Sequence, residues 1–179
     1  PIGPMGPTGP AGTVTPPAPP CFDSSNRYVD CGNGTVTDTV TGLIWLKNAN
    51  CFGNQTYSAA NQAVAALATG QCSLTDGSAA GDWRLPTSAE WAATTARAVA
   101  LGCTGPGAGA PPSLTNDAGM GCLVPGPTSF TGVQSSLYWS SSVLEVFPGR
   151  AWFVDLNEGF VGHANKVLVF FVWPVRGGQ

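Results

Sequence analysis

Apolar and polar residues alternate over short stretches near the start of the chain, as they do in half-buried strands. Tyr28–Asp30 and Thr35–Asp38 flank the turn signal Asn33-Gly34, and the apolar run Leu43–Leu46 follows after a second turn. This pattern predicts hairpin-connected strands. Because the last run is apolar on both faces, we expect it to be a central strand.

The middle of the chain changes to a helical period. A first alanine-rich helix is predicted over residues 59–69, with Gly70 as its C-cap. A second helix is predicted after the N-cap Thr87, where Glu90 completes a capping box, and it should run to about Leu101. The capping role accounts for Glu90, so we do not expect this carboxylate to be catalytic.

The last third returns to the pattern of strands. Strands are predicted at residues 137–142, 151–156 and 160–163, and residues 167–175 form a continuous apolar run that should close the domain as a buried strand. The long Gly- and Pro-rich stretch 103–136 reads as a functional or disulfide-organised loop. Two helices followed by a late antiparallel sheet predict an α+β fold.

The first twelve residues repeat a triplet that begins with proline and ends with glycine. The period predicts a collagen-like triple-helical stem over residues 1–12, because only glycine fits the axis of three intertwined chains. The glycines at that axis are Gly3, Gly6, Gly9 and Gly12. The alternative is a plain Pro/Gly-rich linker. Residues 13–20 predict a stiff Pro-rich linker, and residues 21–179 a globular C-terminal head domain. Since so short a stem would not hold a trimer by itself, either the head trimerises or a longer stalk precedes it.

Six cysteines predict three disulfides and an oxidising compartment. They are Cys21, Cys31, Cys51, Cys72, Cys103 and Cys122. Six cysteines allow fifteen pairings, and the simplest of these joins neighbours along the chain. A metal site is not expected, because the chain has no Cys-x-x-Cys motif and only one histidine. Loop aspartates such as Asp76, Asp82 and Asp117 lack the spacing of a calcium loop.

Composition narrows the possible partners. Charged residues make up only 9% of the chain, and the net charge is −3, which argues against a nucleic-acid partner. No apolar run is long enough for membrane insertion. With one histidine and no unpaired cysteine expected, the chain has few side chains that could act as a nucleophile or as its general base. We therefore expect a protein that is not an enzyme, with no cofactor.

Binding is the more plausible role. Arg150, His163 and Lys166 fall near the ends of the predicted late strands, and in a trimer each would be present three times, so they could hold a sulfate or carboxylate. The alternative is that they are solvated charges, or pair with Glu145 and Glu158 of another subunit. Arg84 is expected to be structural and to pair with Asp82 or Glu90.

Several motifs in fixed order resemble one family. They are Gly34-Thr-Val-Thr-Asp-Thr-Val-Thr-Gly-Leu-Ile-Trp45, Gly81-Asp-Trp-Arg-Leu-Pro-Thr87 with Glu90-Trp91, Tyr138-Trp-Ser-Ser141, Ala151-Trp152 and Val172-Trp-Pro-Val-Arg-Gly177. Together they resemble the C-terminal domain of the Legionella collagen-like adhesin, over about residues 26–177. The resemblance implies a trimeric, C-type-lectin-like head on a collagen stalk that binds sulfated polysaccharides at the bacterial surface. The chain departs from that pattern in its charge, with seven basic residues against ten acidic ones.

Two functions follow as expectations. The first is a secreted homotrimer at the cell surface that mediates attachment, through a polysaccharide or extracellular matrix, between cells or within a biofilm. The second is the structural subunit of an extracellular filament, in which the stem of one trimer docks into the next. Low charge favours the filament, because little repulsion opposes head-to-tail contact.

Overall fold

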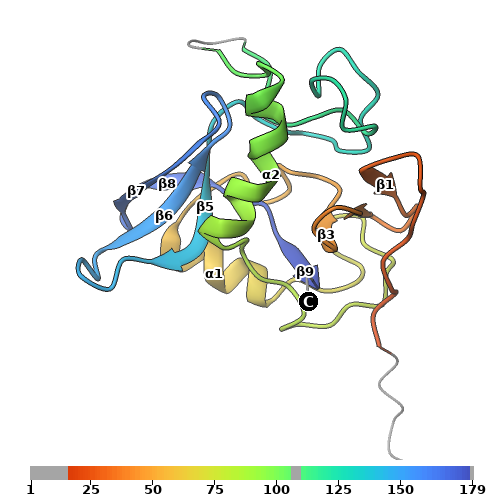
Figure 1. Ribbon diagram of the computed structural model, residues 1–179. Helices are drawn as coiled ribbons and strands as arrows, with labels where there is room; N and C mark the ends of the chain where they lie inside the picture. Colours follow the sequence, from red (N-terminus) through yellow and green to blue (C-terminus); the bar gives the residue numbers. More distant parts are fainter. Residues whose placement is uncertain (1–15, 106–109, 178–179) are drawn as a thin grey trace, which may run out of the picture.

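The strands of the head form two sheets, one built on the predicted early hairpin and one on the predicted late strands (Figure 1). The computed structural model describes residues 16–105 and 110–177. The predicted collagen-like stem, with Gly3, Gly6, Gly9 and Gly12, lies outside the described residues. The α+β class with two helices is confirmed.

The four-stranded sheet contains the predicted early strands. Its order is β1 (Tyr28–Asp30), β2 (Thr35–Asp38), β3 (Leu43–Leu46) and β9 (Val175–Gly177), with every neighbouring pair antiparallel. All four residues of β3 are buried, as expected for a central strand. The early hairpin is therefore confirmed, and the end of the chain adds a strand to it.

The five-stranded sheet has the order β4, β8, β5, β6, β7. These strands are β4 (Asn54–Thr56), β5 (Leu137–Val143), β6 (Arg150–Asp155), β7 (Phe160–Asn165) and β8 (Val169–Phe171). Neighbours are antiparallel except β5 and β8, which pair in parallel. The late antiparallel strands 137–142, 151–156 and 160–163 thus correspond to β5, β6 and β7, while the edge strand β4 has no counterpart in the prediction.

The predicted single buried strand over residues 167–175 is wrong. The run is divided between β8 in one sheet and β9 in the other, and Val167, Leu168 and Val169 are exposed. Pro174 separates the two strands because it has no N–H to donate to a ladder. Its carbonyl instead accepts from the Leu46 N–H at 3.0 Å, which carries the chain from one sheet to the other.

Of the two helices, α2 agrees with the prediction, whereas α1 is shorter than predicted. α2 (Ser88–Ala100) has Thr87 as its N-cap and a complete capping box with Glu90, as expected. α1 (Tyr57–Ala65) begins after the N-cap Thr56 and ends four residues before the predicted Thr69. It ends early because the carbonyl of Ala65 accepts from the N–H of Gly81, so a returning loop takes the place of the next helical turn.

An aromatic cluster fills the space between the sheets and α2. Trp173, from the segment joining β8 to β9, has its ring 4.9 Å from Trp45 of β3 and 6.0 Å from Trp91 of α2. Tyr138 and Phe130 complete the cluster around the same ring. The Trp173 indole N–H donates to the carbonyl of Leu46 at 2.7 Å. A single side chain therefore connects both sheets and a helix.

Three disulfides join neighbouring cysteines in the chain. The pairs are Cys21–Cys31, Cys51–Cys72 and Cys103–Cys122. The last pair closes the base of the long loop, as the loop length suggests. Disulfides in this number are typical of proteins exported to an oxidising compartment. Within the described ranges, no helix has the length and apolarity needed to cross a membrane.

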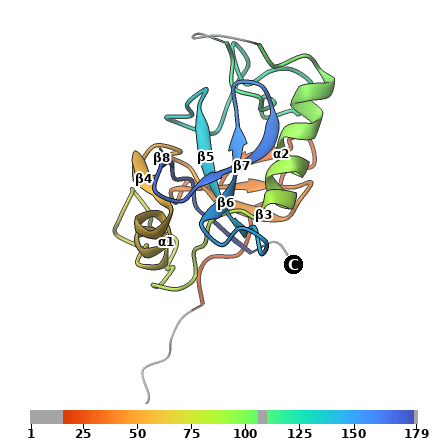
Figure 2. The same ribbon diagram turned by 90° about the vertical axis from the view of Figure 1, so that its left-hand side faces the viewer.

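The described end of the Pro-rich linker is fastened to the head. The Ala18 N–H donates to the Asp76 carbonyl at 2.7 Å, and the Ala18 carbonyl accepts from the Arg176 guanidinium at 2.8 Å. Arg176 lies in β9, near the C-terminal end, so the two ends of the described chain lie together (Figures 1 and 2). Any spacer that holds a stem away from the head must therefore end before Ala18.

Candidate functional site

The three predicted binding residues, which are the cations Arg150 and Lys166 and the imidazole of His163, lie together at one end of the five-stranded sheet. Arg150 begins β6 and His163 lies in the neighbouring β7, and a guanidinium nitrogen of Arg150 is 3.2 Å from Nδ1 of His163. Lys166 follows β7. Its ammonium group donates to the Pro148 carbonyl at 2.7 Å and lies 5.1 Å from the centre of the Tyr57 ring. The pairing of β6 with β7 brings these residues close, as their positions at the strand ends predict.

No carboxylate neutralises these cations within the described chain. Its salt bridges are Arg27–Asp38, Lys47–Asp30, Arg84–Glu90 and Arg176–Asp76. Among the described residues, neither Glu145 nor Glu158 forms an ion pair with Arg150 or Lys166. Pairing between subunits stays a prediction.

Exposed apolar side chains surround Arg150 and Lys166. The sequence pattern did not predict this apolar surface. The turn between β5 and β6 exposes Val146 and Phe147. The turn between β7 and β8 exposes Val167 and Leu168, and Val169 at the start of β8 is exposed beside them. The two turns are held together, because the Lys166 N–H donates to the Gly149 carbonyl at 2.9 Å. We call this surface the sheet-end patch, and its residues are Glu145, Val146, Phe147, Arg150, Lys166, Val167, Leu168 and Val169.

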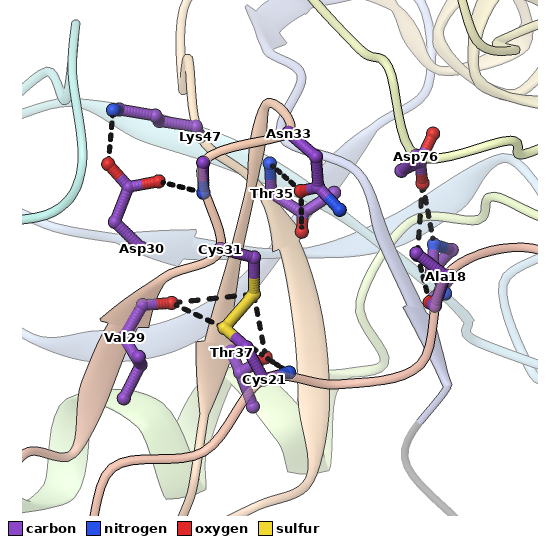
Figure 3. Close-up of a disulfide and its surroundings, with 12 residues drawn as sticks. Ala18, Cys21, Val29, Asp30, Cys31, Asn33, Thr35, Thr37, Lys47 and Asp76 are labelled. Atoms are coloured by element: carbon purple, nitrogen blue, oxygen red, sulfur yellow. Dashed lines mark hydrogen bonds and ion pairs between the residues drawn. A yellow bond between two sulfur atoms is a disulfide. The ribbon is translucent and has the colours of Figure 1, made fainter.

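A second candidate surface is a polar hollow beside the early hairpin. It has a volume of about 380 Å³ and is lined by Gly32, Gly34, Lys47, Asn48, Cys72, Ser73 and Thr131. Figure 3 shows part of its wall, where Lys47 and Asp30 face each other above the Cys21–Cys31 disulfide. The lining combines backbone, hydroxyl, amide and ammonium groups, so it offers both donors and acceptors to a ligand.

The backbone of the hollow is held in an uncommon conformation. Cys72 and Ser73 have positive φ angles of 48° and 64°, which side-chain-bearing residues rarely adopt. Gly34 packs directly against them, and a Cβ at Gly34 would lie 2.5 Å from the Ser73 carbonyl oxygen. The Cys51–Cys72 disulfide fixes this segment to the chain after β3. Such strain persists only where the surroundings impose it, and it is concentrated at binding and active sites.

Charges and unused hydrogen-bonding groups meet at the rim of the hollow. Burial acts to raise the pKa of the Asp30 carboxyl, but the hydrogen bonds from Lys47 and from the Gly32 N–H outweigh it and lower that pKa. Asp30 therefore stays ionised. In the described part of the chain, the Ser73 hydroxyl and the Asn48 side-chain amide N–H groups have no partner. Lys47 also retains ammonium hydrogens beyond the one given to Asp30.

The remaining charged candidates have structural roles. Arg84 pairs with Glu90 through two contacts of 2.6 and 2.7 Å, as one of the two expected partners. Asp76 accepts from Arg176 and from the Ser78 hydroxyl, Asp82 from the Ala79 N–H, and Asp117 from Ser129. No cluster of three or more His, Cys, Asp or Glu side chains that could hold a metal occurs among the residues described.

Comparison with known proteins agrees with the order of the motifs. No curated protein matches the chain. The model of one family, the Lcl C-terminal domain, matches residues 34–176, which is most of the chain. The match includes both helices and the strands from β2 to β8, and the lining of the polar hollow except Gly32. The chain therefore belongs to the Lcl C-terminal domain family, which corresponds to the C-terminal domain of the Legionella collagen-like protein.

Proposed function

We propose that this chain is a secreted, collagen-like attachment protein whose head binds polysaccharide in the polar hollow. The observation that carries the proposal is the hollow itself, a rigid concave surface with unused hydroxyl, amide and ammonium donors beside an ionised carboxylate. Sugars are recognised through such mixed donor and acceptor groups. Family membership and the collagen period of residues 1–12 support a role at the cell surface.

The charge of the chain favours a neutral or weakly acidic polysaccharide over a heavily sulfated one. Among the described residues that line the hollow, Lys47 alone is basic, and Asp30 forms an ion pair with it. A polyanion would meet both a carboxylate and a net charge of −3. Hydrogen bonds to hydroxyl groups would carry the affinity, so binding should depend weakly on salt.

Trimerisation through the stem completes the proposal. Three chains joined over residues 1–12 would present three hollows together, and multivalent contact raises the apparent affinity without new contacts. The C-type-lectin-like character of the head also belongs to the proposal. It is supported by the two helices, the late sheet and the disulfides.

A glycan array on the full chain tests this function, with Ser73→Ala and Asn48→Ala as variants. We expect each variant to keep its fold and to weaken binding to the captured polysaccharide at least about fivefold. Ser73→Ala removes a hydroxyl group, and Asn48→Ala removes the amide N–H donors together with an oxygen that accepts from the Asn50 N–H. Arg97→Ala is the matched control, because Arg97 is exposed on α2 away from the hollow. The proposal is wrong if the wild type captures no glycan, or if the control weakens binding as much as the variants.

A filament subunit is the second candidate. A groove of about 370 Å³ between α2 and residues 118–119 is lined mainly by small apolar side chains, including Ala93, Ala96 and Ala118. The triplets of the stem carry no charge, so the stem of another trimer would suit this groove. Negative-stain electron microscopy at physiological salt separates the candidates, because a filament subunit would form fibres of regular repeat and an attachment protein would form discrete three-fold particles.

A further inference from the structure

The sheet-end patch exposes more apolar surface than a monomeric head in water would favour. Val146 is 78% exposed, Val167 73% and Phe147 60%, and Leu168 and Val169 lie beside them. Val169 begins β8, and the other four belong to two turns that are hydrogen-bonded to each other through Lys166 and Gly149. Contiguous exposed apolar groups of this kind mark interaction surfaces.

The patch lies on the side of the head away from the linker. Figure 1 shows the turn between β5 and β6 at the left, while the first described residues lie at the lower right. α1 extends between the two regions. The Tyr57 N–H at its start donates to the carbonyl of Lys166 in the patch, and the Ala65 carbonyl at its end accepts from Gly81 of the 66–81 loop that holds Ala18. Stems that meet near the linkers would therefore leave the patch free on the opposite side.

The charges of the patch are complementary to themselves. Glu145, Arg150 and Lys166 all belong to this surface, where the Leu144 N–H donates to the Arg150 carbonyl at 3.4 Å. None of the three forms an ion pair within the described chain. In a two-fold contact each patch faces its own copy, so a contact from one residue to a second residue of the partner is repeated in the reverse direction. Glu145 of one head would then meet Arg150 and Lys166 of the other, around a shared apolar centre.

We propose that the sheet-end patch binds the same patch on a second copy of this chain, in an isologous contact between heads of separate stems. This inference rests on the proposed attachment function and gives it a partner, because heads that bind each other would join one cell surface to another. An apolar centre with charges at the rim is the usual anatomy of a protein interface. A glycan would find few hydrogen-bonding groups there.

A charge-swap experiment on the full chain tests the contact. One variant carries Glu145→Lys, and the other carries Arg150→Glu with Lys166→Glu, so that each patch has charges of one sign. Sedimentation velocity should show that wild-type particles double in mass, and that either variant alone associates at least about tenfold more weakly because like charges face each other. A mixture of the two variants should associate again, since opposite charges then meet.

Two further variants guard against a loss of folding. Phe147→Asp should abolish association, whereas Met120→Asp, at an equally exposed residue far from the patch, should leave it unchanged. Thermal unfolding of each variant checks the fold. The inference is overturned if the wild type does not self-associate, or if the mixture of the two charge variants does not associate. It is also overturned if the wild type binds anionic phospholipid vesicles through Phe147 without self-association. Glycan binding by the same variants reports on the polar hollow separately, so one proposal can fail while the other holds.

Discussion

Charged residues are few in this head, and two of its ion pairs, Arg27–Asp38 and Arg176–Asp76, are buried. Asp76 is fully buried and Arg176 nearly so, and they lie 2.9 Å apart beneath the linker residue Ala18. Removing one member of a buried pair leaves the other charge without compensation, which costs far more than the pair contributes. These two residues therefore decide whether the end of the chain and the linker stay in place.

Replacing Arg176 by Met should lower the free energy of unfolding by about 3–5 kcal/mol, because the Asp76 carboxylate is left buried and unpaired. Urea unfolding measured by tryptophan fluorescence checks the size of the loss. Arg97→Met, at an exposed arginine, is the control and should change the free energy of unfolding by less than about 1 kcal/mol. Equal effects of the two variants would contradict a structural role for the buried pair.

Glu90 offers a test that depends on pH. Burial acts to raise its pKa, but the hydrogen bonds from Arg84 and from the Thr87 N–H outweigh burial and lower that pKa. A carboxyl whose pKa is lower in the folded state stabilises the fold above its unfolded pKa of about 4.3 and loses that contribution as the pH falls through the folded pKa.

Glu90→Gln should therefore destabilise the head by about 1 kcal/mol at pH 7, where the ionised side chain is hydrogen-bonded to Arg84. Glutamine still caps α2 through its side-chain oxygen, so the loss reports on the charge. Denaturant unfolding at pH 7 and pH 3 should show the difference between variant and wild type shrinking at the lower pH. A difference that stays constant with pH would rule out the ionised pair as its source.

At the scale of elements, the sequence predicted correctly those strands and helices whose limits depend on contacts between residues close in the chain. The early hairpin and α2 agree with the prediction because a turn at Asn33-Gly34 and a capping box at Thr87 act within a few residues. The end of α1 depends on Gly81, sixteen residues beyond Ala65, and the division of residues 167–175 depends on which sheet each half joins. A continuous apolar run predicts burial, but tertiary placement decides it.

Two substitutions test whether residues 167–175 are divided into an exposed part and a buried part. Trp173→Ala should cost about 3–5 kcal/mol of unfolding free energy, because it empties the centre of the aromatic cluster and removes the bond to Leu46. Leu168→Ala should change that free energy by less than about 0.5 kcal/mol, because Leu168 is exposed. Chemical denaturation of both variants compares them directly, and a large loss at Leu168 would show that the run is buried after all.

At the scale of the whole molecule, the sequence placed the cations but missed their surroundings. Arg150, His163 and Lys166 were predictable because they lie at the ends of adjacent strands. The polar hollow was not, since it joins residues 32–34, 47–48, 72–73 and 131, which only the folded chain brings together. Its one local signal is the Asn33-Gly34 turn, and a turn signal carries no information about what packs against it.

The way the linker enters the head determines how tension would pass through it. A pull on the chain before Pro16 first meets the bonds from Ala18 to Asp76 and Arg176, and then the covalent Cys21–Cys31 bridge to the β1–β2 hairpin. Residues 22–30 lie inside that bridge, so the pull bypasses them and reaches the hairpin at Cys31. Because Arg176 belongs to β9, part of the same pull is taken up at the opposite edge of the four-stranded sheet. With the Cys21–Cys31 disulfide formed, a pull on the residues before Pro16 would thus not unravel the head from the side at which the linker enters it.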